Sequence, residues 1–329
     1  MLSSMIGRRI AFIGLLLVLA SCTPDVPQLP PAEVLEKAVV ASRSLTSAAY
    51  TAKADFAFSG GIFGDGGGTL DVTGAINEGG RTVAGSIEAS ANMHDSEGQE
   101  RAVHAALDTV SVESQRFYLF VRSLSSTPAG GIFDPASVAR LTGVWWQFSP
   151  PEDGAELSVS PSPRLLQAQA RVVQVTRDLG RAEVDGIPAY HYAVALDPDR
   201  FFAYAQELAA ESKQVIDEKA LREEITSLQA TGELWISAVD FHVLGFQWEI
   251  PSLRLPEGSL LRVNITVSLS DYGSAPTVEI PSQSQPFTNT ATILPSDAPD
   301  ADLPDGLSEE DIRSAAGDYP DAAIFPPTD

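Results

Sequence analysis

Apolar and polar residues alternate along much of the chain between residues 50 and 269. A period of two places apolar side chains on one face of a β-strand and polar side chains on the other. The alternation is clearest in segments 50–59, 69–76, 82–93 and 260–269. Further strands are expected at 101–110, 116–121, 143–148, 184–196, 231–236 and 243–250. The pattern predicts about ten strands, joined by short connections into an antiparallel sheet.

A helical period occurs in a few other stretches. Residues 31–45 carry one apolar face, and residues 198–228 form a longer helical region with an expected break near Lys213. Asp134 and Pro135 are typical of a helix start and predict a short helix to residue 141. Residues 163–173 are also interpreted as helical. The predicted fold class is α+β, a curved antiparallel sheet with helices on its concave face.

Glycines mark two turns in this pattern. Residues 60–68 contain six glycines, and Asn77-Glu78-Gly79-Gly80 is a second turn signal. The first stretch does not match the phosphate-binding sequence G-x-x-x-x-G-K-[ST], and no helical pattern follows it. Both stretches are therefore predicted to be hairpin loops.

The last 54 residues, 276–329, differ from the rest of the chain. They contain nine prolines, eleven acidic residues and one arginine. Such a segment has too little apolar surface to offset the entropy lost on ordering. Residues 276–329 are predicted to be a disordered acidic tail, so the folded domain is expected to span residues 31–275.

The first 21 residues have the pattern of an export signal. Arg8 and Arg9 precede an apolar run that is too short to span a bilayer. The run ends in Leu19-Ala20-Ser21-Cys22, which resembles a bacterial lipobox. The resemblance implies cleavage before Cys22 and a lipid on its thiol, with the proline-rich residues 22–30 as a tether. The protein is expected to be extracytoplasmic and anchored to a membrane by this lipid.

The net charge of −23 argues against a nucleic-acid partner. Binding to phosphates needs a basic surface, and no local run of the chain supplies one. Loss of residues 1–21 removes two arginines and no acid, so the mature charge becomes −25. Anionic head groups repel such a chain, and the body is expected to stand away from the membrane on its tether.

The sequence offers little catalytic or metal-binding chemistry. It has one cysteine and four histidines, His94, His104, His191 and His242, without metal-ligand spacing. The nucleophile motif G-x-S-x-G is absent from the sequence. We therefore predict that the protein is not an enzyme and has no metal or other cofactor.

Small residues recur on the apolar faces of the three strands expected at 50–59, 69–76 and 82–93. They are Ala52, Ala54, Gly74, Gly85, Ala89 and Ala91. A close-packed sheet usually carries larger aliphatic side chains at such positions. Small residues allow either a close approach by a helix or room for a ligand, and the residues alone leave both interpretations open.

Three segments carry a resemblance to a known family: residues 42–51, residues 184–192 with the sequence VDGIPAYHY, and residues 232–236 with GELWI. Together with the lipobox and the first helix, they resemble the LppX/LprG-type lipoproteins, which are related in fold to the LolA/LolB lipoprotein carriers. The resemblance spans roughly residues 31–275. It implies a half-barrel sheet whose helices close a hydrophobic cavity for acyl chains, and no catalytic residue.

The side chains expected to line such a cavity come from the strands and from the helix after residue 198. They are Ala52, Ala54, Phe56, Phe58, Leu70, Val72, Gly74, Gly85, Ile87, Ala89, Phe117, Leu119, Phe201 and Phe202. The first hypothesis is therefore a lipoprotein that binds or carries an acyl-chain ligand. The alternative is an interaction lipoprotein with a filled core and an unknown protein partner. A carrier needs an apolar cavity on the order of several hundred Å³.

Overall fold

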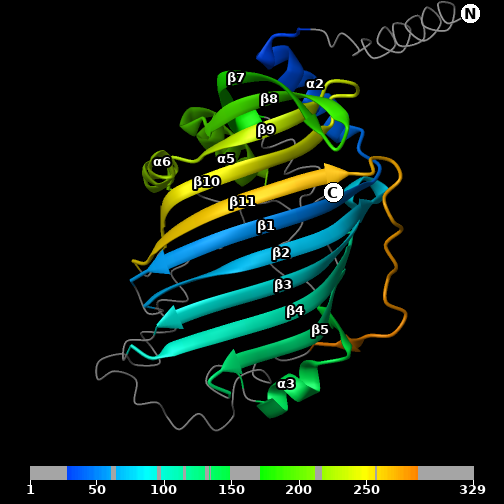
Figure 1. Cartoon of the computed structure of the whole chain (residues 1–329), viewed down its shortest axis with the longest axis vertical. Coiled ribbons are helices and arrows are strands. Elements are labelled where there is room, and N and C mark those ends of the chain that lie inside the picture. The colour runs from blue at the N-terminus through cyan, green and yellow to red at the C-terminus, as the bar shows by residue number, and fades with distance from the viewer. Residues whose placement is uncertain are drawn as a thin grey trace, which may run out of the picture. The chain divides into compact units, whose positions relative to one another are not determined.

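A computed structural model describes residues 28–60, 64–94, 98–113, 116–129, 133, 135–148, 171–211, 217–255 and 258–287. The chain divides into a unit of residues 1–30 and a unit of residues 31–329. The described part of the second unit contains one sheet of twelve strands (Figure 1). The architecture is a curved, open sheet with helices, so the predicted fold class is confirmed.

The strands follow one another in space almost as they do in sequence. Their order across the sheet is β12-β6-β5-β4-β3-β2-β1-β11-β10-β9-β8-β7. All neighbours are antiparallel except β12 and β6. The strands are β1 (Ala48–Ser59), β2 (Asp65–Asn77), β3 (Thr82–His94), β4 (Glu100–Val112), β5 (Arg116–Thr127), β6 (Trp145–Phe148), β7 (Val173–Val184), β8 (Ile187–Leu196), β9 (Thr231–Ser237), β10 (Val243–Arg254), β11 (Leu260–Ser270) and β12 (Gln285–Pro286).

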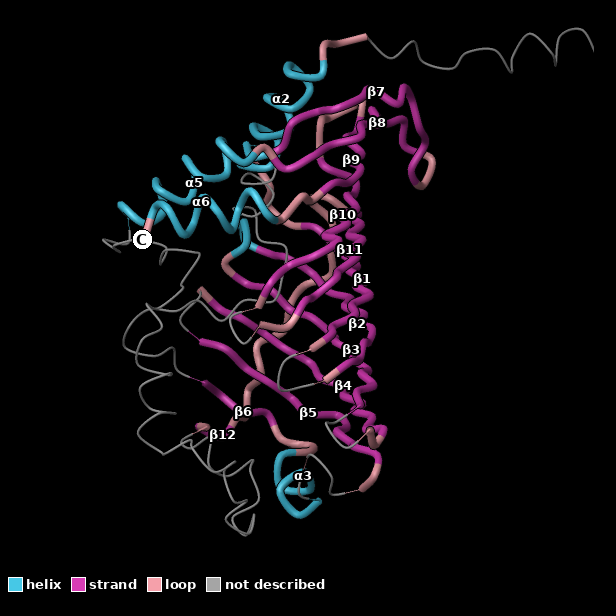
Figure 2. The backbone as a smooth tube through the Cα atoms, turned by 90° about the vertical axis from the view of Figure 1, so that its left-hand side faces the viewer, coloured by secondary structure: helices cyan, strands magenta, loops and turns pink. Residues whose placement is uncertain are grey.

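The helices α2, α5 and α6 lie on one side of the sheet, over the part formed by β7 to β10 (Figure 2). Strands β6 and β12 curve toward the same side, which is the concave face. Helix α3 lies at the other end of the sheet. The helices are α2 (Pro31–Arg43), α3 (Pro135–Leu141), α5 (Pro198–Glu211) and α6 (Glu218–Ser227), and a 3-10 turn, η2, spans Glu78–Gly80.

Local sequence signals account for the helix positions. The side chain of Asp197 accepts hydrogen bonds from the backbone N–H groups of Asp199 and Arg200, which makes it the N-cap of α5. Helix α2 buries Val34 and Ala38 completely. Helix α6 is held to α5 by an ion pair of 2.8 Å between Arg222 and Asp199. The short amphipathic helices are thus stabilised by tertiary contacts rather than by their length.

Strand β7 was missed by the sequence analysis, which predicted no element over 174–183. The strand begins at Val173 and pairs along its length with β8. The helix predicted over 163–173 is confirmed at residues 171 and 172, and it ends before Val173, which is the first residue of the strand. The pairing register shifts twice, between Val175 and Arg177 and between Asp178 and Gly180. Each bulge inserts a residue and reverses the apolar–polar alternation, so no continuous period of two marks this strand.

The glycine-rich stretch 60–68 is only partly a loop. Strand β2 begins at Asp65, and Gly66, Gly67 and Gly68 pair with Phe58, Ala57 and Phe56 of β1. A Cβ atom on Gly66 or Gly68 would lie within 2.6 Å of the ring of Phe58 or Phe56. These two glycines are therefore required because aromatic rings from β1 lie flat over them.

The boundary predicted at residue 275 is placed too early. The backbone N–H of Val278 donates to Asn77 Oδ1, and Asn77 Nδ2 donates to the carbonyl of Pro276. Farther along, β12 pairs with β6, and the ring of Phe287 stacks on Phe148 with centroids 4.5 Å apart. Residues 276–287 thus run past the strand ends and pack on the body (Figure 1). Composition concealed this because a few apolar residues in a proline-rich segment make the contacts.

Several predictions concern residues outside those described. They are the export signal 1–21, Cys22, the cap at Asp134, the helix over 163–170, the break near Lys213 and the tail from residue 288. None of the described helices has the length and apolar character needed to cross a membrane.

Candidate functional site

Strand register brings the predicted cavity residues of β1, β2 and β3 onto one face of the sheet. Ala54 lies opposite Leu70, and Leu70 lies opposite Ala89. The same pairing extends in both directions into a row across ten strands: Leu124, Ala105, Ala89, Leu70, Ala54, Ile265, Trp248, Gly232, Val194 and Val175. No member of this row has a polar or charged side chain apart from the indole of Trp248. We call it the central row.

A second apolar row lies two residues away along the strands. It consists of Val121, Leu107, Ile87, Val72, Ala52, Val267, Phe246, Leu234 and Tyr192. Helix α2 lies on this face, because Leu35 and Ala38 of α2 line a pocket together with Leu234 and Phe246. Both rows therefore belong to the concave face.

The opposite face is polar. Lys53 lies 3.6 Å from Asp71, and Arg122 pairs with Asp108 and Glu88 at 3.2 and 3.6 Å. These side chains are between 32% and 73% exposed, so solvent screens the ion pairs and they contribute little to stability. The positions of these ion pairs show which face of the sheet meets water and which face carries the apolar side chains.

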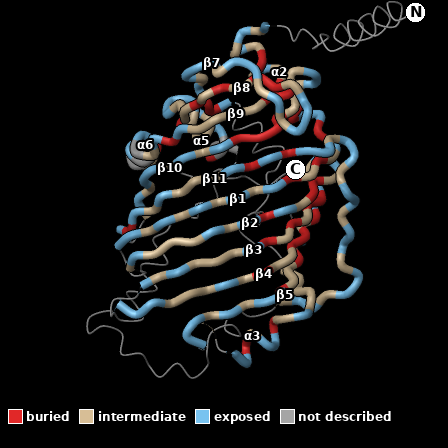
Figure 3. Tube along the Cα trace, in the orientation of Figure 1, coloured by how far each residue is buried: buried red, intermediate tan, exposed pale blue. Residues whose placement is uncertain are grey.

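The concave face has two regions that differ in burial. Under the helices, Tyr190, Tyr192, Ile236 and Val194 are at most 3% exposed. Across β5 to β1, β11 and β10, the central-row side chains from Leu124 to Trp248 are only half-buried. Figure 3 shows this difference, with buried residues near α2 and at one end of β1 to β5, and intermediate and exposed residues along the rest of those strands. We call them the covered region and the open region.

Tyr50 closes one end of the open region. Its hydroxyl donates to the carbonyl of Ala84 at 3.1 Å, and burial raises its pKa far above the ordinary value. A Cβ atom on Gly74 would lie 2.6 Å from the Tyr50 ring, and one on Gly85 would lie 3.0 Å from its hydroxyl. Gly74 and Gly85 therefore do not open onto free space, contrary to their expected place in a cavity wall. The predicted alanines, Ala52, Ala54, Ala89 and Ala91, are all half-buried.

Aromatic residues form the other end of the open region. Phe56 and Phe58 are half-buried, and their rings stack with centroids 6.4 Å apart. Both rings lie over glycines of β2. They therefore lie flat against the sheet and do not project from it. Trp248 lies over Gly232 in the same way, with a Cβ atom at Gly232 3.2 Å from the indole.

The predicted residues outside β1 to β3 lie in separate places. Phe117 of β5 packs edge-on against Phe148 of β6, and Leu119 pairs with Trp146. Both extend the concave face toward β12. Phe202 of α5 is 6% exposed and lies under the guanidinium of Arg222, 4.1 Å from the ring centroid, whereas Phe201 is half-buried. Phe202 therefore belongs to the packing of α5 and α6.

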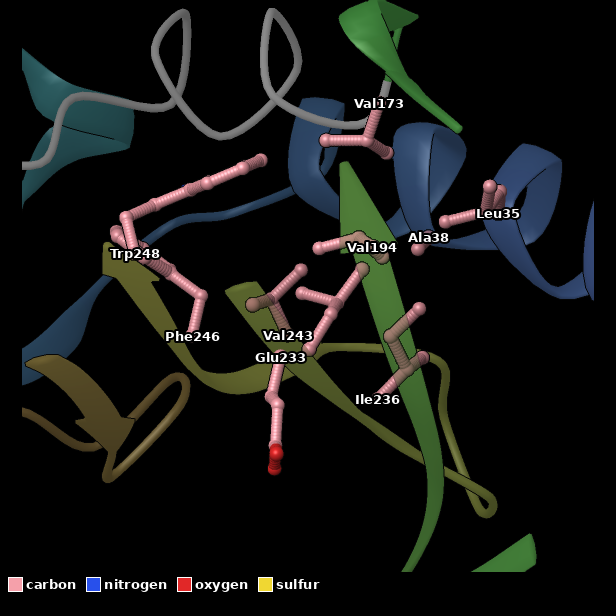
Figure 4. A pocket seen from close by; sticks show the side chains of 10 residues that line it. Leu35, Ala38, Val173, Val194, Glu233, Ile236, Val243, Phe246 and Trp248 are labelled. Atoms are coloured by element: carbon pink, nitrogen blue, oxygen red, sulfur yellow. The ribbon is translucent and has the colours of Figure 1, made fainter. Parts of the chain in front are cut away.

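One pocket lies in the covered region, between α2 and the sheet (Figure 4). Its volume is about 10 Å³, which is space for about one water molecule. The carboxylate of Glu233 points away from the other labelled side chains and binds His191 on the polar face at 2.6 Å. The apolar lining residues are Leu35, Ala38, Val173, Val194, Leu234, Ile236, Val243, Phe246 and Trp248. This pocket does not meet the expectation of several hundred Å³.

One buried polar atom stands out in the covered region. Tyr192 is 0% exposed, and its hydroxyl has no hydrogen-bond partner among the described residues. Burial, followed by the charge of Asp178, raises its pKa to about 12. An unpaired hydroxyl in an apolar site costs free energy. The packing of the aromatic ring, rather than the hydroxyl, therefore stabilises this position.

Sequence reasoning missed the lining residues of α2, β9 and β10. The alternation of Phe246, Trp248 and Ile250 was a usable signal, since it places the three side chains on one face of β10. What the alternation could not show is which strands become neighbours. Among the described residues, no group of three or more His, Cys, Asp or Glu side chains could hold a metal ion.

The chain matches no protein-family model, and a comparison with curated proteins finds no match. Solved structures do match. LppX of Mycobacterium tuberculosis is 9% identical, with 75% of this chain and 97% of that chain covered and a TM-score of 0.34. LprF of Mycobacterium bovis is 14% identical, with 77% and 97% covered and a TM-score of 0.30.

A LolA superfamily protein of Nitrosomonas europaea is 8% identical, with 74% and 95% covered and a TM-score of 0.20. LppX-type and LolA-type proteins are those that the sequence resembles. At these identities and TM-scores, the matches carry no argument about the fold or the ligand of this chain. The function of this chain has to be inferred from its own side chains.

Proposed function

We propose that the protein is a membrane-anchored, extracytoplasmic lipoprotein that binds an acyl-chain ligand on the open region of its concave face. The observation that carries this proposal is the central row. From Leu124 to Trp248 it is half-buried, and it crosses the sheet without a charged side chain. A half-buried apolar strip of this extent is typical of a binding surface.

The chemistry of the open region fits a hydrocarbon chain. Burial of each CH₂ group contributes about 0.8 kcal/mol, so a long acyl chain needs no polar group for its affinity. Alanines at positions 52, 54 and 89 keep the middle of the face free of large side chains, and Phe56 and Phe58 lie flat at one end. The ligand would lie across the strands along the central row.

The covered region is not the proposed binding site. Its pocket of about 10 Å³ is too small for an acyl chain, and α2 fills the space above it. The proposed anchor is Cys22, joined to the body by residues 22–30. No charge or metal is needed for either role.

The decisive experiment compares two substitutions on opposite faces of β1. Ala54→Trp fills the centre of the open region, whereas Ala57→Trp places the same side chain on the exposed, polar face. Both proteins are purified as Cys22→Ser forms from a lipid-rich host, and bound lipid is measured by native mass spectrometry and by extraction. We expect Ala57→Trp to retain lipid and Ala54→Trp to lose it, with both folded.

Two results would contradict the proposal. A wild-type protein without lipid, combined with strong destabilisation by Ala54→Trp, would show that the face is packed. That result would leave the interaction lipoprotein with a filled core in its place. Equal lipid retention by both tryptophan variants would place the ligand elsewhere.

A separate experiment tests the anchor. Cys22→Ser is expected to move the protein from the membrane fraction to the soluble fraction without a change in melting temperature. A variant that still sediments with membranes in high salt would show that another part of the chain holds it there.

A further inference from the structure

One charged side chain lies on the concave face of the open region. Arg101, the second residue of β4, pairs with Met93 of β3. The same line of pairs continues through Gly66 of β2 to Phe58 of β1. Phe58 is four residues from Ala54 in β1, so it points to the same face as the central row. The line of pairs that ends at Arg101 therefore belongs to the concave face.

The exposure of β4 agrees with this assignment. Arg101 is half-buried, whereas Glu100 and His104, an odd number of positions away on the same strand, are exposed. In the register, every other charged residue of β1 to β5, β10 and β11 falls on the polar face. Within the described part of the chain, Arg101 is thus the single charged side chain on the concave face of these seven strands.

A hydroxyl group lies next to Arg101 on the same face. Ser126 of β5 pairs with Val103, which is two residues from Arg101 along β4. Ser126 is half-buried, and its hydroxyl donates to the carbonyl of Pro128 at 3.3 Å. Because this bond uses the one proton of the hydroxyl, Arg101 is the side chain of this pair that can donate to an anion.

The two ends of the open region differ in polarity. At one end, the buried side chain of Tyr50 closes the face, and its hydroxyl is bonded to the carbonyl of Ala84. Arg101 lies toward the other end, where β1, β3 and β5 terminate (Figure 1). It is four residues from Ala105 of the central row, about 14 Å along β4. The long arginine side chain and a polar head group together cover that distance.

We propose that the acyl-chain ligand carries an anionic head group, a carboxylate or a phosphate, and that the guanidinium of Arg101 binds it. This inference rests on the proposed function and adds the chemical class of the ligand. A planar guanidinium binds either anion through two parallel, charge-assisted hydrogen bonds. It has five N–H donors, so it can bind a head group while another of its donors is engaged elsewhere.

The charge of the whole chain makes Arg101 decisive for the choice of ligand. The net charge is −23, so an anionic ligand is repelled by the protein as a whole. An uncharged apolar strip alone would therefore favour a neutral ligand over an anionic one. The strip supplies the affinity for the chain, and Arg101 selects the head group.

The binding of cis-parinaric acid and of its methyl ester tests the head group. The two ligands share one fluorescent hydrocarbon chain and differ in charge. The Cys22→Ser protein is first freed of bound lipid by extraction, and each ligand is then titrated by fluorescence. We expect Arg101→Gln to weaken binding of the acid by about ten-fold or more, because a hydrogen-bonded charge pair is lost. Binding of the ester is expected to stay unchanged.

Two further substitutions serve as controls. Arg262→Gln removes the same charge from the polar face, where Arg262 is exposed and pairs with Ala57. It is expected to leave the affinities for both ligands unchanged. Arg101→Lys keeps the positive charge and is expected to retain the preference for the acid in weaker form, which separates a loss of charge from a loss of packing.

A competition experiment distinguishes a phosphate from a carboxylate. Lysophosphatidic acid and a monoacylglycerol of the same chain length each displace the bound methyl ester, whose own binding does not involve Arg101. If Arg101→Gln weakens lysophosphatidic acid alone, the head group is a phosphate. If it weakens cis-parinaric acid alone, the head group is a carboxylate, and either result supports the proposal.

The outcomes separate the head group from the binding of the chain. If the ligands bind but Arg101→Gln changes no affinity, or weakens charged and neutral ligands equally, the assignment of Arg101 is wrong and the acyl-chain site remains. If no ligand binds, or if Ala54→Trp leaves every affinity unchanged, the proposed acyl-chain site is wrong. The assignment of Arg101 then falls with it.

Discussion

The two regions of the concave face are built from the same strands and the same alternation, yet they differ in burial. In the covered region, α2 packs on β8 and β9, where Leu35 lines a pocket with Val194, and Ile236 is completely buried. In the open region, Leu70 occupies an equivalent inward position on β2 and is half-buried. The difference arises because the helices cover only part of the sheet (Figure 2). An amphipathic strand therefore specifies which face is apolar, and its partners decide whether that face is core or surface.

The largest expected effect comes from matched truncations in the two regions. Ile236→Ala is expected to lower the free energy of unfolding by about 2–5 kcal/mol, because a buried side chain leaves a cavity. Leu70→Ala is expected to cost about 1 kcal/mol, because a half-buried side chain loses less contact. Urea denaturation measures both. Equal losses would show that the open region is packed as tightly as the covered region.

The contact of residues 276–287 with the body is tested by two truncations. A chain that ends at Ala275 loses the packing of Val278 and Phe287, whereas a chain that ends at Phe287 keeps it. We expect the shorter chain to be less stable by about 2–3 kcal/mol, the value for two partly buried apolar side chains. Thermal and urea denaturation of the two chains would reveal the difference. Equal stabilities would mean that the segment contributes nothing.

A smaller effect distinguishes the two buried tyrosines. Tyr50→Phe removes a hydroxyl that donates to Ala84 and is expected to cost about 0.5–1.5 kcal/mol. Tyr192→Phe removes a hydroxyl that has no partner in the part of the chain that the structure describes, and it is expected to leave stability unchanged or to raise it. The two proteins differ by one oxygen atom each, so each serves as the control for the other. A large loss in Tyr192→Phe would reveal a partner for its hydroxyl.

The raised pKa of Tyr192 predicts a dependence on alkaline pH. Below pH 10 the tyrosine is protonated in both the folded and the unfolded chain, so it causes no pH dependence there. Between pH 10 and about 12 the unfolded chain loses the proton first, and the free energy of unfolding falls. Tyr192→Phe is expected to make this fall shallower in denaturation series at increasing pH. A fall of unchanged slope would assign it to the other buried tyrosines, Tyr50 and Tyr272, whose pKa values burial also raises.

The sequence predicted those parts of the candidate site that follow from the alternation of apolar and polar residues along a strand. Ala54, Leu70 and Ala89 were assigned to one face from sequence, and the register places them directly opposite one another. Gly74 and Gly85 were assigned to the same cavity wall, but the ring of Tyr50 covers them. Alternation assigns a side chain to a face, whereas the space above that face depends on side chains from neighbouring strands.

The sequence by itself determined most of the strands, the polar and apolar faces and the start of α5, because each follows from residues within a few positions of one another. The tertiary structure alone decided that β1 lies between β2 and β11 and that Phe287 reaches Phe148. These contacts join residues far apart in the chain. Local periodicity carries no information about them, because long-range pairing depends on the complementarity of whole surfaces.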